Sequence, residues 1–198
     1  FDTSARELIH AGLQNLDEAR SLFRQLSASG FDAARCGLLL DALQHVCYPD
    51  VALRNLVDIV NAQVSQGRAL DDIVPDDTAF RQLVAVLGVS DAMGKLMRFR
   101  PDLVQAAATD HCNSHLYNHD QRRAHVLESV GADPNDRMSP TATMDLADAA
   151  TALRRTYRNQ LAAIIAQDTM SDDPIALQPR ISSELSDLAD AALEGALA

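Results

Sequence analysis

Histidines stand at positions 111, 115 and 119 in the middle of the chain, and Cys112 adjoins the first of them. Residues four apart share one face of a helix, and imidazole and thiolate groups are common zinc ligands. The neighbouring asparagine and serine residues disfavour a helix here, and three ligands on one straight helix do not readily surround a metal. The pattern favours a polar exposed loop and leaves open whether His111, His115 and His119 bind a metal.

The acidic residues lack the spacing of a metal clamp. No two of the 28 aspartates and glutamates are separated by a single residue, so the chain has no Asp-x-Asp pair of the kind that holds metal in nucleotidyl transfer. The three adjacent aspartate pairs, at 71–72, 76–77 and 172–173, point their side chains apart. Two carboxylates acting together on one metal ion are therefore not expected in this sequence.

Gly88, Gly94 and Lys95 resemble a P-loop at first sight. The spacing between the glycines is one residue too long, Leu96 stands where a P-loop has Ser or Thr, and no strand precedes Gly88. Two helices joined at Gly88 account for the pattern better. The chain also has no Gly-x-Ser-x-Gly nucleophile elbow. We therefore predict no catalytic, cofactor-binding or metal-binding residue.

Three arginines, Arg154, Arg155 and Arg158, fall within one turn of a predicted long helix. A solvated polar face explains them without any function, since exposed helix faces are commonly charged. A second explanation is that they dock another surface. We keep both, and name these three residues as a possible domain interface.

The long helix is the element on which the predicted fold depends. Residues 144–168 contain neither Gly nor Pro, and apolar residues recur at spacings of three and four. Ser139-Pro140 is a plausible start signal and the Ser171–Pro174 segment a stop. The helix is expected near residues 142–168, and its 25-residue stretch at 144–168 would be roughly 37 Å long. Its predicted inner face comprises Leu146, Ala149, Ala150, Leu153, Tyr157, Leu161, Ile164 and Ile165.

Composition indicates an all-α protein. Hydrophobic residues make up 47% of the 198 positions, aromatic residues only 4%, and Trp is absent. We predict an irregular array of about nine or ten helices. The predicted organisation is an N-terminal array of short helix hairpins over 1–131, a linker over 132–139 and a long antiparallel helix pair over 140–198. The last helix is expected to turn Ile181, Leu185, Leu188 and Ala192 inward.

Capping residues and glycines place the shorter helices. Helix starts are expected at Ser4, Asp17, Asp32, Asp50 and Ser90. Gly88 is predicted to follow the end of a helix at the C′ position. Residues from about 109 to 118 are predicted to form a loop.

Charge and cysteine content limit the partners and the compartment. The formal charge of −11 argues against nucleic acid and against an anionic membrane surface, because both require a basic protein. Three cysteines without a C-x-x-C pair fit a reducing cytosol. No 18-residue apolar run and no signal peptide are visible. We expect a cytoplasmic protein, and the absence of an initial Met suggests a part of a longer chain.

Three stretches resemble hallmarks of the glutamine synthetase adenylyltransferases. They are Leu87–Val104 (LGVSDAMGKLMRFRPDLV), the arginine-rich segment 152–168, and segment 185–194 (LSDLADAALE), in the family's order and at about its spacings. Together the resemblance covers roughly residues 83–197. The chain departs from the pattern at Gln167, where the family usually has Arg, and at Asn159-Gln160, where a charged pair is common.

The resemblance implies a large enzyme with two nucleotidyltransferase halves. In such enzymes the N-terminal half removes AMP from glutamine synthetase by phosphorolysis and the C-terminal half adds AMP from ATP. Each half uses magnesium bound by a Gly-Ser…Asp-x-Asp motif, which this chain lacks, so no catalytic residue carries over. The implied partners are glutamine synthetase and a PII-type nitrogen-signal protein, with magnesium and ATP as cofactors of the parent enzyme and none in this segment.

A stand-alone helical interaction module is the alternative. Its composition would be the same, so the residues do not separate the two hypotheses. Sequence beyond Ala198 distinguishes them: a strand with Gly-Ser and Asp-x-Asp there supports the enzyme.

Overall fold

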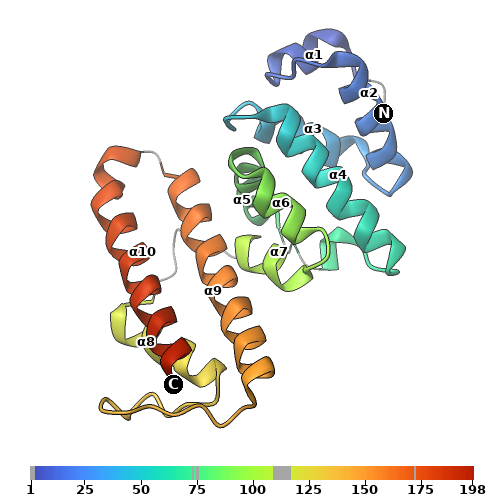
Figure 1. Ribbon diagram of the computed structural model, residues 1–198. Coiled ribbons are helices and arrows are strands. Elements are labelled where there is room, and N and C mark those ends of the chain that lie inside the picture. Colours follow the sequence, from blue (N-terminus) through green and yellow to red (C-terminus); the bar gives the residue numbers. More distant parts are fainter. Residues whose placement is uncertain (1–2, 73, 75, 109–116, 172) are drawn as a thin grey trace. The chain divides into compact units, whose positions relative to one another are not determined.

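The computed structural model describes residues 3–72, 74, 76–108, 117–171 and 173–198 (Figure 1). Over these residues it contains ten α-helices, one short 3-10 helix and no strand, so the all-α prediction is confirmed. The chain divides into two compact units, Phe1–Asp110 and His111–Ala198, which are described separately below. No helix in the described ranges is both long and apolar enough to cross a membrane.

Unit 1 is an array of short helices around a pair of packed central ones. Helices α4 (Pro49–Ser65) and α5 (Asp77–Val89) pack against each other. Around this pair lie α2 and α6 against α4, and α3 and α7 against α5. The remaining bounds are α1 Ala5–His10, α2 Leu16–Ala28, α3 Ala33–Leu43, η1 Leu70–Asp72, α6 Asp91–Met97 and α7 Pro101–Ala108.

Most helix starts follow the capping signals in the sequence. Ser4 and Glu7 form the predicted capping box, and the side chains of Asp32, Asp76 and Ser90 each accept a bond from a backbone N–H of the first turn. At α4 the missing N–H of Pro49 falls at N1, where no bond is lost. Helix α2 is capped by Asn15, which accepts a bond from the N–H of Glu18, and not by Asp17 as predicted. Short polar side chains thus set the starting residues of five helices in unit 1.

The prediction for Gly88 is wrong. Helix α5 continues through it to Val89, and Gly88 does not have a positive φ. A Cβ built on Gly88 would lie 2.8 Å from the Cβ of Val46, so the glycine permits close packing. Gly94 does the same for α6, because a Cβ there would overlap the side chain of Asn55 on α4. The two glycines of the apparent P-loop therefore serve helix packing.

Helix α7 was missed by the sequence analysis. Arg100-Pro101 does end α6, but Pro101 then occupies the first position of a new helix that buries Leu103, Val104 and Ala107. A proline that breaks one helix can begin the next. The predicted loop over 109–118 lies largely outside the described residues.

Unit 2 is a bundle of three helices, α8 (His119–Ser129), α9 (Leu146–Thr169) and α10 (Pro174–Leu197). Helix α10 packs against both of the others, and α8 also packs against α9. The sequence placed its boundary at the linker 132–139, whereas the contacts group α8 with α9 and α10. The turn-rich segment 132–139 therefore connects two helices of one unit.

The predicted long helix is α9, with corrections to its start and its inner face. Asp145 caps it, accepting bonds from the N–H groups of Ala147 and Asp148, whereas the Ser139-Pro140 start signal lies in the preceding loop. Leu146 and Tyr157 are 86% and 38% exposed, although both were predicted to lie on the inner face. Ile164 is 1% exposed and packs with Ile181 and Leu188 of α10, with Leu161 beside them.

Helix α10 is longer than its predicted core suggested and is buried along a slightly different line. It begins at Pro174, with Asp173 as its cap, and continues through Pro179. Leu185 was predicted to face inward but is 42% exposed. The buried line of α10 consists of Ile181, Glu184, Leu188, Ala191 and Gly195.

A pair of substitutions in α9 tests this assignment of its faces. Ile164→Ala is expected to lower the free energy of unfolding by about 2–5 kcal/mol, because it removes buried methyl groups and leaves a cavity. Leu146→Ala, at an exposed position of the same helix, is the matched control and should change it by less than about 0.5 kcal/mol. Denaturant unfolding measures both, and equal effects would contradict the assignment.

Candidate functional site

A buried arginine lies at the centre of unit 2. Arg122 of α8 is 1% exposed, and its Nη1 donates to Oε1 of Gln160 on α9 at 2.8 Å. Its Nη2 lies 3.7 Å from Oε2 of Glu184 on α10, an ion pair too long to be a hydrogen bond. One guanidinium therefore contacts a polar side chain from each of the other two helices.

Burial controls the electrostatics of this cluster. Loss of water lowers the pKa of Arg122, while the negative charges of Glu184 and Asp187 act in the opposite direction. Glu184, also buried, accepts a 3.0 Å bond from Nε of Arg180 at its other oxygen. A buried charge is costly unless it is paired, so a helix displacement that separated Arg122 from Glu184 would be strongly unfavourable.

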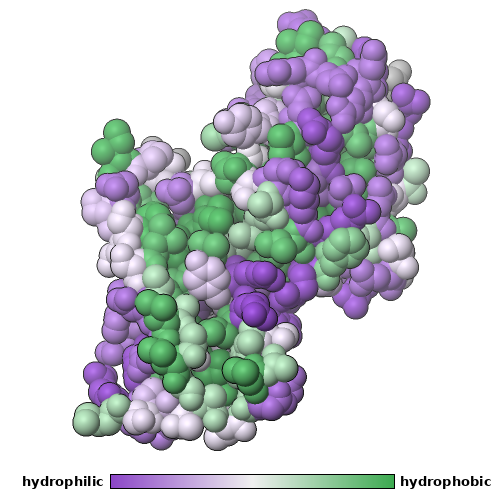
Figure 2. Space-filling model, in the orientation of Figure 1, coloured by the Kyte–Doolittle hydropathy of each residue, from purple (hydrophilic) through white to green (hydrophobic). Residues whose placement is uncertain are grey.

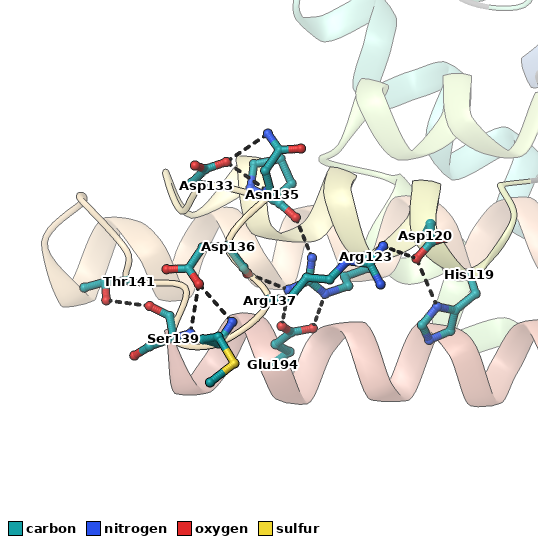
Figure 3. A network of polar contacts seen from close by, with 12 residues as sticks. His119, Asp120, Arg123, Asp133, Asn135, Asp136, Arg137, Ser139, Thr141 and Glu194 are labelled. Atoms are coloured by element: carbon teal, nitrogen blue, oxygen red, sulfur yellow. Dashed lines mark hydrogen bonds and ion pairs between the residues drawn. The ribbon is translucent and has the colours of Figure 1, made fainter.

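A second arginine fastens one end of the bundle (Figure 3). Arg123 binds Glu194 of α10 in a bidentate manner, through Nε at 2.8 Å and Nη2 at 2.5 Å. It also donates to the backbone carbonyls of Pro134 and Asp136, at 2.6 and 2.9 Å. Through these bonds Arg123 joins α8 to α10 and to the loop after α8. The hydrogen bond from Arg123 to Glu194 raises the pKa of Arg123.

The loop between α8 and α9 is held by its own carboxylates (Figure 3). Asp136 accepts bonds from the N–H groups of Ser139 and Met138, at 3.0 and 2.9 Å. Thr143 donates its hydroxyl to the carbonyl of Gly131, whose positive φ of 77° favours glycine. Bonds from the Ser139 and Met138 N–H groups hold the pKa of Asp136 below its ordinary value of 3.8.

The three arginines predicted as an interface lie within an arc of about 100° on α9, with Arg158 between Arg154 and Arg155. Arg154 and Arg158 are four residues apart and share a side of α9, with Arg154 exposed and Arg158 half-buried. Arg155 lies about 100° around the helix from Arg154, since α-helices turn once in 3.6 residues. Arg155 is exposed but already has an interaction within the chain. Arg154 and Arg158 are thus the pair available on one flank.

The histidine cluster is only partly described. His111, Cys112 and His115 lie outside the described residues, and His119 begins α8 with its Nδ1 3.8 Å from Oδ1 of Asp120. Within the described ranges, no three His, Cys, Asp or Glu side chains are placed to hold a metal ion. Whether the three histidines bind a metal stays an open prediction.

Unit 1 contains a hollow of about 410 Å³ bordered by α3, α4 and the start of α5. Arg35 lies in its wall, stacked 4.3 Å above the ring centre of Phe80. Its guanidinium is paired with Asp71 at 2.8 Å and Asp77 at 3.6 Å. Arg35 is the one cation among the described residues that line this hollow, and it is neutralised by the chain's own carboxylates, which gives it a structural explanation.

The Arg122–Glu184 pair was missed by sequence reasoning, although a signal for it exists. Arg122 stands four residues before buried Val126, and Glu184 four before buried Leu188, so both fall on the apolar line of their helix. A charged residue in phase with an apolar stripe indicates a buried pair when each of two helices carries one.

Comparison with known proteins identifies the class and then the family. The chain is an all-α protein in which buried and half-buried arginines of α8 pair with polar side chains of α9 and α10. It is 64% identical, over all 198 residues, to the "Bifunctional glutamine synthetase adenylyltransferase/adenylyl-removing enzyme" of Bifidobacterium longum strain DJO10A. The protein of the same name from B. longum subsp. infantis is 63% identical over 198 residues, and that from Leifsonia xyli subsp. xyli is 30% identical over 196.

The recognition from sequence is confirmed: over its whole length the chain corresponds to a segment of the bifunctional glutamine synthetase adenylyltransferase/adenylyl-removing enzymes. It spans only 18% of the length of these three relatives. The alternative of a stand-alone interaction module is not favoured. No family model matches the chain, and no solved structure matches it either.

The buried pair generates a stability prediction. Glu184→Leu leaves the Arg122 charge buried without its counter-ion, and we expect a loss of about 3 kcal/mol or more in the free energy of unfolding. In the double variant Arg122→Met, Glu184→Leu, both charges are absent, and most of that loss should be recovered. Urea titrations of the wild type, Glu184→Leu, Arg122→Met and the double variant test this. A double variant as unstable as the sum of its two single variants would show that the charges do not depend on each other.

The helix cap at Asp145 generates a pH prediction. Bonds from Asp148, chiefly from its backbone N–H, hold the pKa of Asp145 below its ordinary value of 3.8. The folded carboxylate therefore adds stability above that value, and this is lost as pH falls through the lowered pKa. Asp145→Asn keeps a capping oxygen but does not titrate. In thermal melts from neutral to acid pH, the wild type should lose its advantage over Asp145→Asn, and a constant difference would contradict the assignment.

Proposed function

We propose that this chain is a helical segment of a glutamine synthetase adenylyltransferase/adenylyl-removing enzyme. The observation that carries the proposal is the 64% identity along all 198 residues to enzymes of that name. The parent enzyme would add AMP to glutamine synthetase and remove it, with a PII-type nitrogen-signal protein as a further partner. We further propose a cytoplasmic location and no nucleic-acid or membrane partner, which the charge of −11 supports.

The segment would contribute no reacting group. The activity in the relatives' name implies ATP, and the family resemblance implies magnesium. The described residues show whether either could bind here. The described residues offer no group of three metal-binding side chains, and Lys95, the single lysine of the chain, is paired with Asp91 at 2.6 Å. The described residues therefore do not fit a magnesium site, and we place the nucleotide and the metal elsewhere in the parent enzyme.

The role left for the segment is positioning. In unit 2 the Arg122 cluster and the Arg123–Glu194 pair hold three helices in one arrangement. A surface on which another domain docks needs this kind of rigidity. We propose that Arg154, Arg155 and Arg158 lie at an interface with another domain of the parent enzyme. Arginine suits such a place because its planar guanidinium binds carboxylates at two points.

The proposal is tested with two proteins, the 198-residue chain and the longer enzyme that contains it. Glutamine synthetase with ATP and magnesium reports AMP addition, and adenylylated glutamine synthetase with phosphate reports AMP removal as ADP. We expect both activities from the longer enzyme and neither from the chain alone, because its acidic residues lack the Asp-x-Asp spacing. Inactivity of the longer enzyme in both assays would contradict the family function. ADP formation by the chain alone would contradict the positioning role.

A further inference from the structure

Helix α10 carries a second apolar stripe outside its buried one. Leu185, Ala189 and Leu193 follow one another at spacings of four, and Leu185 and Leu193 are 42% and 64% exposed. Ala192 and Ala196 lie beside them, half-buried and exposed. Figure 2 shows hydrophobic residues gathered along α10. A run of this length on one helix exceeds the scattered leucines that ordinary surfaces expose.

The stripe lies on the flank of α10 that borders α9. Glu194 marks the flank toward α8, since it pairs with Arg123, and Ala189 and Ala192 lie on the opposite flank by helical phase. On α9, Gln160 marks the side toward α8, and Arg154 and Arg158 lie on the side away from it. The apolar stripe and the two arginines therefore border the same seam between α9 and α10.

Contacts along the helices place the arginines at the level of Leu193. A Cβ on Gly195 would lie 3.2 Å from Leu153, and Ile164 packs with Ile181 and Leu188. The two helices are thus antiparallel, and the Arg154–Arg158 segment lies beside the part of α10 around Leu193. The alanines keep this seam shallow on the α10 side, so the backbone of a further helix could approach closely.

Charge selects the kind of partner. Arg154 and Arg158 stand on a protein of formal charge −11, and neither arginine forms an ion pair with a described residue of unit 2. An apolar seam edged by two arginines is complementary to an amphipathic helix with acidic residues beside its apolar face. Most of the relatives' length lies outside the matched segment, which is 18% of the whole.

We propose that the α9–α10 seam is covered by an acidic amphipathic helix from another part of the parent enzyme. This inference rests on the proposed function, because it needs a longer polypeptide. Leu185 and Leu193 enter the apolar face of that helix, and its carboxylates bind Arg154 and Arg158. The sequence indicated only that these arginines could lie at a domain interface, and the proposal adds the kind of segment that binds there.

The test is the chemical accessibility of a cysteine placed in the stripe. Leu193→Cys is made in the 198-residue chain and in the longer enzyme, and alkylation by N-ethylmaleimide is followed by mass spectrometry of the peptide that contains it. We expect labelling to be slower in the longer enzyme by on the order of tenfold or more, as for other groups shielded from solvent. Equal rates in the two proteins would overturn the proposal.

Two controls make the result specific. Ser183→Cys lies on an exposed part of α10 away from the seam, and its labelling rate should be the same in both proteins. Arg154→Glu with Arg158→Glu should restore fast labelling of Leu193→Cys in the longer enzyme, whereas Arg→Lys at both sites should retain most of the protection. If Leu193→Cys stays protected after both arginines are replaced by glutamate, the partner is not acidic and the proposal is wrong.

The remaining outcomes are also decisive. If Leu193→Cys is protected in the 198-residue chain alone and the protection increases with concentration, a second copy covers the seam and the proposal is wrong. Labelling requires no catalysis, so a longer enzyme that transfers no AMP but protects Leu193→Cys would contradict the proposed function and leave the docking surface supported. A longer enzyme that transfers AMP but does not protect Leu193→Cys would support the proposed function and contradict the docking surface.

Discussion

The guanidinium of Arg122, buried among three helices, constrains how the helices of unit 2 align with one another. It is held by Gln160 of α9 and paired with Glu184 of α10, so α8 is tied to both neighbours at one point. Apolar packing alone tolerates a slide of one turn between helices, because leucine, isoleucine and alanine surfaces are similar. A buried charge does not tolerate it, since a displaced Arg122 would lose its counter-ion in a region that excludes water.

The Arg123–Glu194 pair extends this constraint to the end of the bundle. Adjacent residues of α8 thus serve different purposes, with Arg122 turned into the core and Arg123 turned to the loop after α8. Both arginines bind α10, on the flank that faces α8. The opposite flank of α10 has no such polar partner among the described contacts, and it is the one that retains an exposed apolar stripe.

The helices could be predicted because their signals are local. Ser4, Asp32 and Ser90 cap helices where the sequence indicated, and the 25-residue stretch without Gly or Pro is α9 within a few residues. Which side of a helix is buried depends on its neighbours, and there the reasoning failed. Leu146 is apolar but projects beyond the helices that bury Ile164, and Glu184 is charged but lies in the core. The capping signal at Asn118 was also overlooked, although it forms a full capping box with Gln121.

The error over Leu185 has a physical cause that bears on function. A helix buried on one side shows one apolar stripe, so periodicity finds its inner face. Helix α10 has two, and its alanines at 189, 191, 192 and 196 join them into a broad apolar surface. The inner stripe contains the charged Glu184, whereas the outer stripe is wholly apolar, so residue type alone favours the outer stripe as the buried one. This pattern is typical of a helix that packs on more than one side. Within unit 2, α8 and α9 cover only the inner stripe of α10.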